Sequence, residues 1–242
     1  MDRLSSLISR FRMRVNIASP SEANLLVLAS PEGAAETVLF CAQAPLLPPR
    51  DGVCLALRVE WAGSHNPLIS ALPARVEVRL AQTPQLAALL TLMRQEVECH
   101  RCGAESVLSS LGQAFMVRLL RHLIEAGTAE PGLLAGLSDL RLARAIVSMH
   151  DHPGRLWTTQ DLATEAGLSV SRFSELFAAQ VGETPMGYLR RWRLTLARQD
   201  LIRGDRVEAV ARRYAYESPE GFTRAFRKAY GVAPVSLRHS AA

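Results

Sequence analysis

One local pattern of residues occurs twice in the chain, at 158–182 and at 205–231. In both copies polar side chains cluster at one end of a helix. Each copy predicts a helix, a tight turn and a second helix whose polar side remains exposed. The residues expected to be exposed on the second helices are Ser171, Arg172, Ser174 and Glu175 in the first copy, and Glu220, Gly221, Thr223, Arg224, Arg227 and Lys228 in the second. A second helix held away from the protein body is the element that enters a DNA major groove.

The inner faces of both copies are apolar. In the first copy the leading helix turns Leu162, Ala163 and Ala166 inward, Gly167 makes the turn above Leu168, and Phe173, Leu176 and Phe177 face them from the second helix. In the second copy the inner set is Val207, Val210, Ala211 and Tyr214, opposed by Phe222, Phe226 and Tyr230. The helix starts are marked by a capping box at Thr158–Asp161 and by Thr184-Pro185 and Ser218-Pro219.

A helix from about 185 to 203 is predicted between the two copies, and Gly204 can end it. At 1.5 Å per residue its length is about 28 Å, close to the roughly 34 Å between successive major-groove faces. Tyr188, Leu189, Trp192 and Leu196 form its apolar side, and Arg190, Arg191, Arg193 and Arg198 are expected to reach outward. Such a rod can hold two reading helices on one side of a duplex.

Composition and charge fit a cytoplasmic, soluble protein. Of the 242 residues 48% are apolar, yet no apolar run approaches the roughly 20 residues of a membrane span, and no signal peptide opens the chain. Residues 1–139 carry 12 Arg/Lys against 13 Asp/Glu, whereas 140–242 carry 16 against 10. The basic half is the one with the repeated pattern. Basic charge supplies salt-dependent affinity for nucleic acid, although a solvated basic surface would show the same balance.

The N-terminal half predicts an α+β arrangement. Short Val- and Leu-rich segments at 24–30, 36–42, 53–63 and 75–81 indicate a small antiparallel β unit. Two helices follow, one from Thr83-Pro84 with Leu86, Leu89, Leu90 and Met93 on one face, the other with Val107, Leu111, Phe115, Leu119 and Leu123 at steps of four. Gly and Pro make 127–139 the best linker, which divides the chain into domains 1–126 and 140–242.

The segment 142–238 resembles the DNA-binding domain of AraC/XylS-type bacterial transcription regulators. The resemblance rests on DLATEAGLSVSRFSELFAAQVGETPMGYLRRWRLTLA and YESPEGFTRAFRKAYGVAP, with Ala215-Tyr216 where the family usually has Gly-Phe. It implies base contacts by Ser171, Arg172, Ser174, Glu175, Glu220, Thr223 and Arg224. Arg can donate two bonds to guanine, Glu can accept from cytosine, and Ser or Thr can do either. Phosphate contacts are expected from Arg190, Arg191, Arg227 and Lys228.

The N-terminal half also carries a resemblance, in MDRLSSLISRFRMRVNI and VCLALRVEWAGSHNPLISALPARVEV. These are similar to the opening helix and strand and to the closing strands of the cupin-like sensor half of one AraC-type subgroup, which residues 1–126 resemble in a shortened form. The resemblance implies double-stranded DNA and RNA polymerase as partners and a homodimer through the helices of 83–126, whose apolar faces could equally be domain core. It leaves a small-molecule effector open and implies no membrane partner. No His-x-His pair occurs in the β region, so no metal-dependent cupin activity and no cofactor are expected.

The motif Cys99-His100-Arg101-Cys102 admits three interpretations. The thiolates and the imidazole could bind zinc or copper, close thiols beside basic groups could be oxidised, or the motif is incidental. The whole chain also has competing functions. A regulator of transcription without enzymatic activity is the leading one. A DNA-alkylation repair protein is disfavoured by the cysteine spacing, and a scaffold that does not bind DNA remains as a third.

Overall fold

The computed structural model describes Leu4, residues 7–8, 13–30, 32–42 and 52–61, Ile69, and residues 72–99, 102–127 and 131–238. The chain divides into two compact units, called here the N-terminal unit (residues 7–127) and the helical unit (residues 128–242, with Leu4).

Five antiparallel strands form one sheet in the N-terminal unit. They are β1 (Met13–Ile17), β2 (Leu25–Ala29), β3 (Ala35–Phe40), β4 (Val53–Trp61) and β5 (Val76–Arg79). The strand order is β1-β4-β2-β3-β5, so the long strand β4 lies between β1 and β2. The predicted antiparallel β unit is therefore confirmed. β2, β4 and β5 fall within the expected segments, β3 begins one residue earlier, and β1 lies in the opening stretch that the resemblance gives as a strand.

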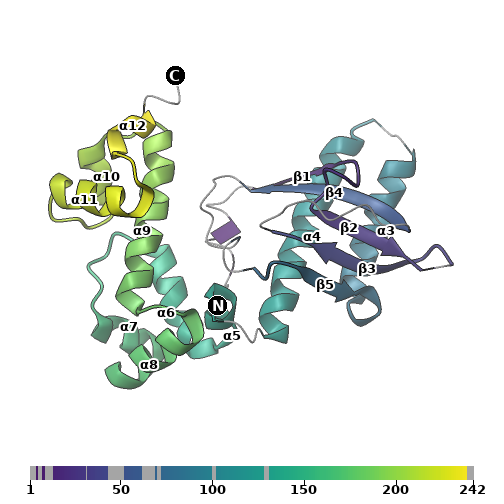
Figure 1. Cartoon of the computed structure of the whole chain (residues 1–242). Helices are drawn as coiled ribbons and strands as arrows, with labels where there is room; N and C mark the ends of the chain where they lie inside the picture. The colour runs from purple at the N-terminus through teal and green to yellow at the C-terminus, as the bar shows by residue number, and fades with distance from the viewer. Residues whose placement is uncertain are drawn as a thin grey trace. The chain divides into compact units, whose positions relative to one another are not determined.

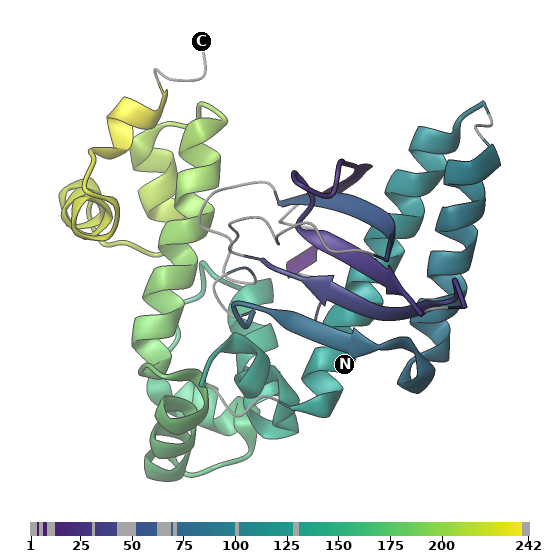
Figure 2. The same cartoon turned by 45° about the vertical axis from the view of Figure 1, so that its right-hand side comes forward.

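Two long helices, α3 (Pro84–Cys99) and α4 (Ala104–Ala126), pack on each other, and α4 also contacts β1. They cover one face of the sheet (Figure 2). The contact is close at Gly112, where an added Cβ would lie 2.5 Å from Cγ1 of Val15. A residue with a side chain at that position would push α4 away from the sheet, so Gly112 sets the distance between the layers.

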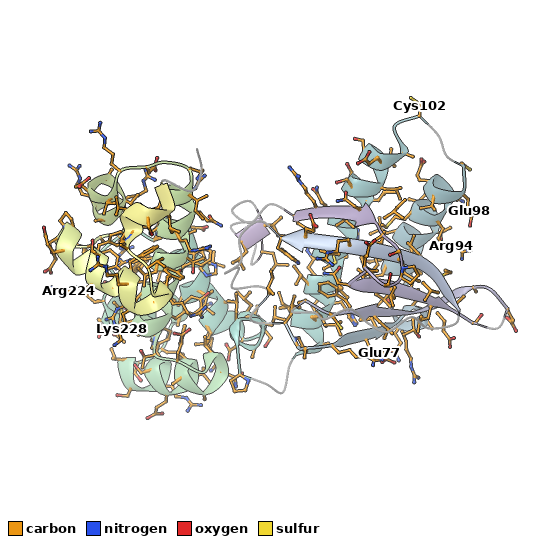
Figure 3. All side chains as sticks on the ribbon, turned by 45° about the horizontal axis from the view of Figure 1, so that its top comes forward. Glu77, Arg94, Glu98, Cys102, Arg224 and Lys228 are labelled. Carbon is orange, nitrogen blue, oxygen red and sulfur yellow. The ribbon has the colours of Figure 1, made fainter. Side chains whose placement is uncertain are left out.

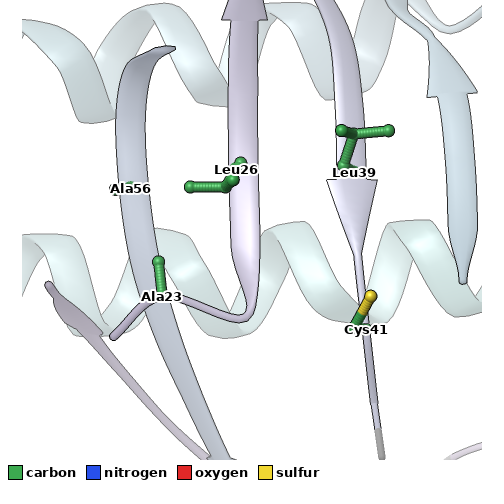
Figure 4. Close-up of a cluster of buried hydrophobic side chains, with 5 residues drawn as sticks. All are labelled: Ala23, Leu26, Leu39, Cys41 and Ala56. Carbon is green, nitrogen blue, oxygen red and sulfur yellow. The ribbon is translucent and has the colours of Figure 1, made fainter. Parts of the chain in front are cut away.

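The opposite face of the sheet is apolar as well. A cluster of Ala23, Leu26, Leu39, Cys41 and Ala56 is buried there (Figure 4). Alternate residues of the same strands point to the helix side and are also buried, Leu25, Val27, Val38 and Phe40 among them. Burial on both faces explains why β2 reads as an uninterrupted apolar run rather than as an alternating pattern.

The predicted apolar stripe of α4 is wrong at its ends. Val107 is 41% exposed, whereas Leu108 beside it is buried. Residues four apart in a helix of 3.6 residues per turn advance by about 40° at each step, so a stripe of five such residues runs around the helix. Only its central members, Phe115 and Leu119, face the core completely.

The helical unit contains eight helices among its described residues. They are α5 (Leu133–Ser138), α6 (Leu140–Asp151), α7 (Thr159–Ala166), α8 (Val170–Val181), α9 (Pro185–Ile202), α10 (Val207–Arg213), α11 (Pro219–Tyr230) and α12 (Pro234–Arg238). The long helix α9 runs through the middle of the unit, with α7 and α8 at one end and α10, α11 and α12 at the other (Figure 1).

The predicted linker at 127–139 contains a helix and is wrong over that part. Leu133–Ser138 form α5, which packs on α6 and α8 inside the helical unit. The residues Leu133, Leu134 and Leu137 are buried. Gly132 and Gly136 interrupt the apolar periodicity of this segment, which is why its sequence indicates a break instead of a short buried helix.

Candidate DNA-reading surface

The first motif, α7 and α8, is shaped by caps at three points. Thr158 and Asp161 form the predicted capping box at the start of α7. Gly167 ends that helix with φ of +70°, a left-handed conformation that glycine adopts without steric cost. Ser169 then starts α8 by accepting a hydrogen bond from the amide of Arg172. These caps confine the turn between α7 and α8 to residues 167–169.

The core beneath this motif holds α8 at a fixed angle. Leu162, Ala163 and Ala166 are buried as predicted, and the rings of Phe173 and Phe177 lie 5.5 Å apart at an edge-to-face angle. The small side chains at 163 and 166 allow the two helices to approach closely. Leu176, predicted to be buried, is only partly so.

The polar end of α8 is open to solvent. Ser171, Arg172 and Glu175 are exposed, and Ser174 is half-buried. Arg172 and Glu175 approach to 3.9 Å with 60% and 70% of their side chains exposed. An ion pair this long and this exposed contributes little to stability. Both side chains can therefore turn toward a bound molecule at small cost.

The second motif, α10 and α11, repeats the arrangement with larger rings. Val210, Ala211 and Tyr214 are buried against Phe222 and Phe226. The ring of Phe226 also packs on Tyr230, with centroids 4.7 Å apart. The hydroxyl of Ser218 accepts a hydrogen bond from the amide of Gly221 and caps α11, as Ser218-Pro219 predicts.

The turn of the second motif is strained at Ala215. Its φ of +58° makes it the one non-glycine residue with positive φ in the described part of the chain. Only glycine occupies that region without a steric penalty. The neighbouring Tyr216 packs its ring on Phe222 at 5.1 Å, and burial raises the pKa of its hydroxyl. The turn thus forms in spite of the alanine, because the rings around it hold it.

The outer side of α11 is basic. Glu220, Arg224, Arg227 and Lys228 are exposed and Thr223 is half-buried; Figure 3 shows Arg224 and Lys228 standing out from this helix. Residues 205–231 carry six Arg or Lys against four Asp or Glu, whereas residues 158–182 carry one Arg against three acids. The two motifs therefore differ in net charge, +2 for the second and −2 for the first, while residues 183–204 between them carry five Arg against two acids.

The arginines of α9 differ from one another in their surroundings. Arg190 is exposed, and Arg191 pairs with Glu183 at 2.5 Å. Arg198 stacks its guanidinium 5.7 Å from the centre of the Tyr230 ring. Arg193 does not reach outward, contrary to the prediction: it donates hydrogen bonds to the carbonyl oxygens of Pro153 and Arg155. Arg193 turns inward because the loop that contains Pro153 and Arg155 lies beside it. The helical period of α9 alone does not show that this loop is close.

The apolar pattern of α9 did not lead us to predict one buried acid on this helix. Asp200 is 4% exposed and lies four residues after Leu196, on the same stripe as Tyr188 and Trp192. It bonds Arg203 at 2.5 Å and the hydroxyl of Tyr214 at 2.7 Å. The signal in the sequence is an acidic residue that takes the next position of an apolar stripe with a spacing of four. Such an acid is expected to be buried, and a buried carboxylate requires hydrogen-bond or ion-pair partners.

A second buried polar group lies between α6 and α9. His150 is 1% exposed, and its Nε2 is 2.6 Å from the hydroxyl of Tyr188. The imidazole also packs on Trp192, with ring centroids 4.1 Å apart. Burial raises the pKa of Tyr188 well above its usual range, so this hydroxyl stays protonated. The pair joins the two helices inside the core and has no access to a ligand.

The cysteines give no metal centre within the described residues. Cys99 ends α3 and Cys102 lies just before α4, and both are exposed free thiols; Figure 3 labels Cys102 beyond the end of that helix. His100, the third member of the motif, lies outside the described residues. Nowhere in the described part do three His, Cys, Asp or Glu side chains gather in a way that could hold a metal ion. The same part has no helix long and apolar enough to cross a membrane.

Comparison with known proteins covers both units. A family described as a helix-turn-helix domain matches residues 162–240, and one described as a cupin matches residues 10–125. An AraC-like transcription regulator of Streptomyces lividans is 35% identical over 176 residues, which are 71% of this chain and 58% of that protein. An HTH-type transcriptional regulator of Haemophilus influenzae is 29% identical over 174 residues, 72% of this chain and again 58% of the relative.

A solved AraC-type transcriptional regulator from Chromobacterium violaceum aligns with 43% of this chain and 95% of its own, at 24% identity and a TM-score of 0.41. Together, the two family matches and the fold define a protein with a cupin-like sheet followed by a double helix-turn-helix unit. The chain belongs to the AraC-type helix-turn-helix family. It spans a little over half the length of the curated relatives that it matches.

Proposed function

We propose that the chain is a bacterial, cytoplasmic transcription regulator that binds duplex DNA sequence-specifically, reading two successive major grooves with α8 and α11. One observation carries the proposal: α9 joins two motifs whose second helices each present an exposed polar end. With 18 residues, α9 is about 27 Å long at 1.5 Å per residue. That length approaches the repeat of the major groove along one side of DNA, about 34 Å.

The proposed division of roles follows side-chain chemistry. Arg172, Arg224 and Glu175 are exposed near the N-terminal ends of their helices, where recognition helices touch base edges. Arg donates a bidentate pair to guanine and Glu accepts from cytosine. Ser171, Ser174, Glu220 and Thr223 complete the base-reading set.

Phosphate contacts are assigned to the remaining cations. Arg227 and Lys228 are exposed farther along α11, and Arg190 is exposed on α9. Arg191 can join them only by sharing its guanidinium with Glu183, which holds it at present. Since phosphate contacts carry no sequence information, these residues set affinity and its salt dependence.

The N-terminal unit is proposed to modulate the helical unit, through dimerisation or a small-molecule effector, with RNA polymerase as a further partner. The AraC-like and HTH-type relatives support a role in transcription, since their names describe regulators of transcription. No catalytic step is assigned to the chain.

Selection of bound sequences from a random duplex pool, using the full chain, tests the proposal. The expected result is an enriched sequence whose footprint covers two adjacent helical turns on one side. Absence of any enriched sequence would refute it. Arg224→Ala should then cost about 1–3 kcal/mol at the selected site and relax the preference at one base position.

Two matched variants separate the assigned roles. Arg190→Ala should weaken binding to all duplexes alike and reduce the salt slope by about one. Arg121→Ala, an exposed arginine on α4 in the other unit, should leave both quantities unchanged. If Arg224→Ala behaved as Arg190→Ala does, its assignment to base reading would be wrong.

A further inference from the structure

The loop between α6 and α7, residues 152–158, is fastened to α9 by one side chain. Arg193 donates from Nε to the carbonyl oxygen of Pro153 at 2.7 Å and from Nη2 to that of Arg155 at 2.6 Å. Arg193 is half-buried, and burial lowers the pKa of its guanidinium. Because the guanidinium is planar and rigid, two bonds from it fix the direction of the loop as well as its distance.

The same loop touches the second motif. A Cβ added at Gly154 would lie 2.3 Å from the carbonyl oxygen of Arg213, the last residue of α10. Cβ atoms do not approach a backbone oxygen so closely, so only glycine permits this contact. The backbone that leads into the first motif therefore packs directly on the backbone of the second.

Arg213 is held from its other side by α9. Its Nη1 donates to Asp200 at 2.5 Å and to Asp205 at 2.6 Å. These two carboxylates raise the pKa of the Arg213 guanidinium. The hydroxyl of Tyr214 donates to the same oxygen of Asp200. The backbone of residue 213 thus lies against the loop while its side chain lies against the long helix.

We infer that Gly154, Arg193, Asp200 and Arg213, together called the brace, hold the two motifs at one separation and one angle. The protein then measures the spacing between the two DNA elements that it reads. The inference rests on the proposed function, because spacing matters only if both motifs contact one duplex. Each base pair advances the groove by about 3.4 Å and turns it by about 35°. If the brace fixes the two motifs relative to each other, α8 and α11 cannot both keep their base contacts after one base pair is added between the two DNA elements.

The first test varies the operator. One base pair is inserted or deleted between the two elements of the selected sequence, and the affinity of the full chain is compared across the three duplexes. The wild type should lose about 100-fold or more on either change, a loss of the size of one or two mismatched base pairs. In Gly154→Ala and Arg193→Gln that ratio should fall below 10-fold, roughly one mismatch.

Matched controls separate spacing from affinity and from folding. Gly132→Ala places a Cβ in open space on extended backbone and should keep the wild-type ratio. Arg190→Gln removes a cation from the same helix as Arg193 without touching the loop. It should weaken all three duplexes alike and leave the ratio intact.

The second test needs no DNA. Spin labels attached through bio-orthogonal amino acids at Ala179 and Ala229, exposed positions on α8 and α11, report the distance between the two helices. The wild type should show one narrow distribution, and both brace variants a broad one at unchanged helicity. Should Gly154→Ala fail to fold, Arg193→Gln alone decides.

A narrow distribution in the folded variants, or an unchanged spacing ratio, would overturn the inference. A failure to select any sequence would instead refute the proposed function, and the label distances would still decide the role of the brace.

Discussion

Replacing Ala215 by glycine should stabilise the helical unit. The residue has φ of +58°, where an alanine pays about 1–2 kcal/mol for the contact between its Cβ and the backbone. Glycine removes that contact but has more freedom to lose on folding, which costs about 0.4–1 kcal/mol. The difference predicts that Ala215→Gly raises the free energy of unfolding by roughly 0.5–1 kcal/mol.

Thermal unfolding followed by tryptophan fluorescence measures this gain. Trp157 and Trp192 are buried in the helical unit, while Trp61 lies in the sheet of the other, so most of the signal reports the unit that changes. For a domain of this size the expected rise in Tm is about 2–5 °C. Urea unfolding, monitored in the same way, gives the free energy directly.

A glycine control in the same unit gives the opposite sign. Ala179 is exposed in the last turn of α8, where glycine is still worse than alanine, by up to about 1 kcal/mol. Ala179→Gly should therefore lower the Tm. If Ala215→Gly also lowered it, or left it unchanged while the control behaved as expected, the turn would not be strained by its alanine.

Two further substitutions test the polar groups of the same unit. The hydroxyl of Tyr216 is buried and has no hydrogen-bond partner among the described residues. In urea unfolding, Tyr216→Phe should therefore leave the free energy of unfolding unchanged or raise it by at most about 1 kcal/mol. A clear loss of stability would mean that the hydroxyl is hydrogen-bonded in solution. Asp139 caps α6 and accepts a hydrogen bond from Arg141, which lowers the pKa of the carboxyl below its ordinary value of 3.8. The stabilisation by the ionised carboxylate is complete above that ordinary value and is lost as the pH falls through the lowered pKa. The wild type and Asp139→Asn should therefore converge in Tm at acid pH. A Tm difference that stays constant as the pH is lowered from neutral into the acid range would contradict the assignment.

Local sequence signals predict most of the helical unit. The capping box at Thr158, the Ser218-Pro219 start and the glycine at 167 each act within four residues, so their geometry follows from the chain itself. The spacing of Phe222 and Phe226 indicates the buried side of α11 for the same reason. Where the pattern is short or broken, as at Leu133–Ser138, the sequence misses a helix that packing stabilises.

Contacts between distant segments require the tertiary structure. The helical period of α9 places Arg193 beside three other arginines, and nothing in that period shows that the loop at Pro153 lies within hydrogen-bond reach. The sheet is a similar case. The apolar runs predict strands, but the order β1-β4-β2-β3-β5 depends on pairing between residues far apart in the chain.

By itself, the order of residues determined where helices start and stop in the second half, which of their sides is apolar, and which polar ends stay exposed. These properties depend on neighbours one or two turns away. Folding in three dimensions decided which charged groups remain available to a ligand. Arg172 and Arg224 stay exposed. Arg193 and Asp200 instead form hydrogen bonds within the protein, and these bonds exist only because segments distant in the sequence lie side by side in the fold.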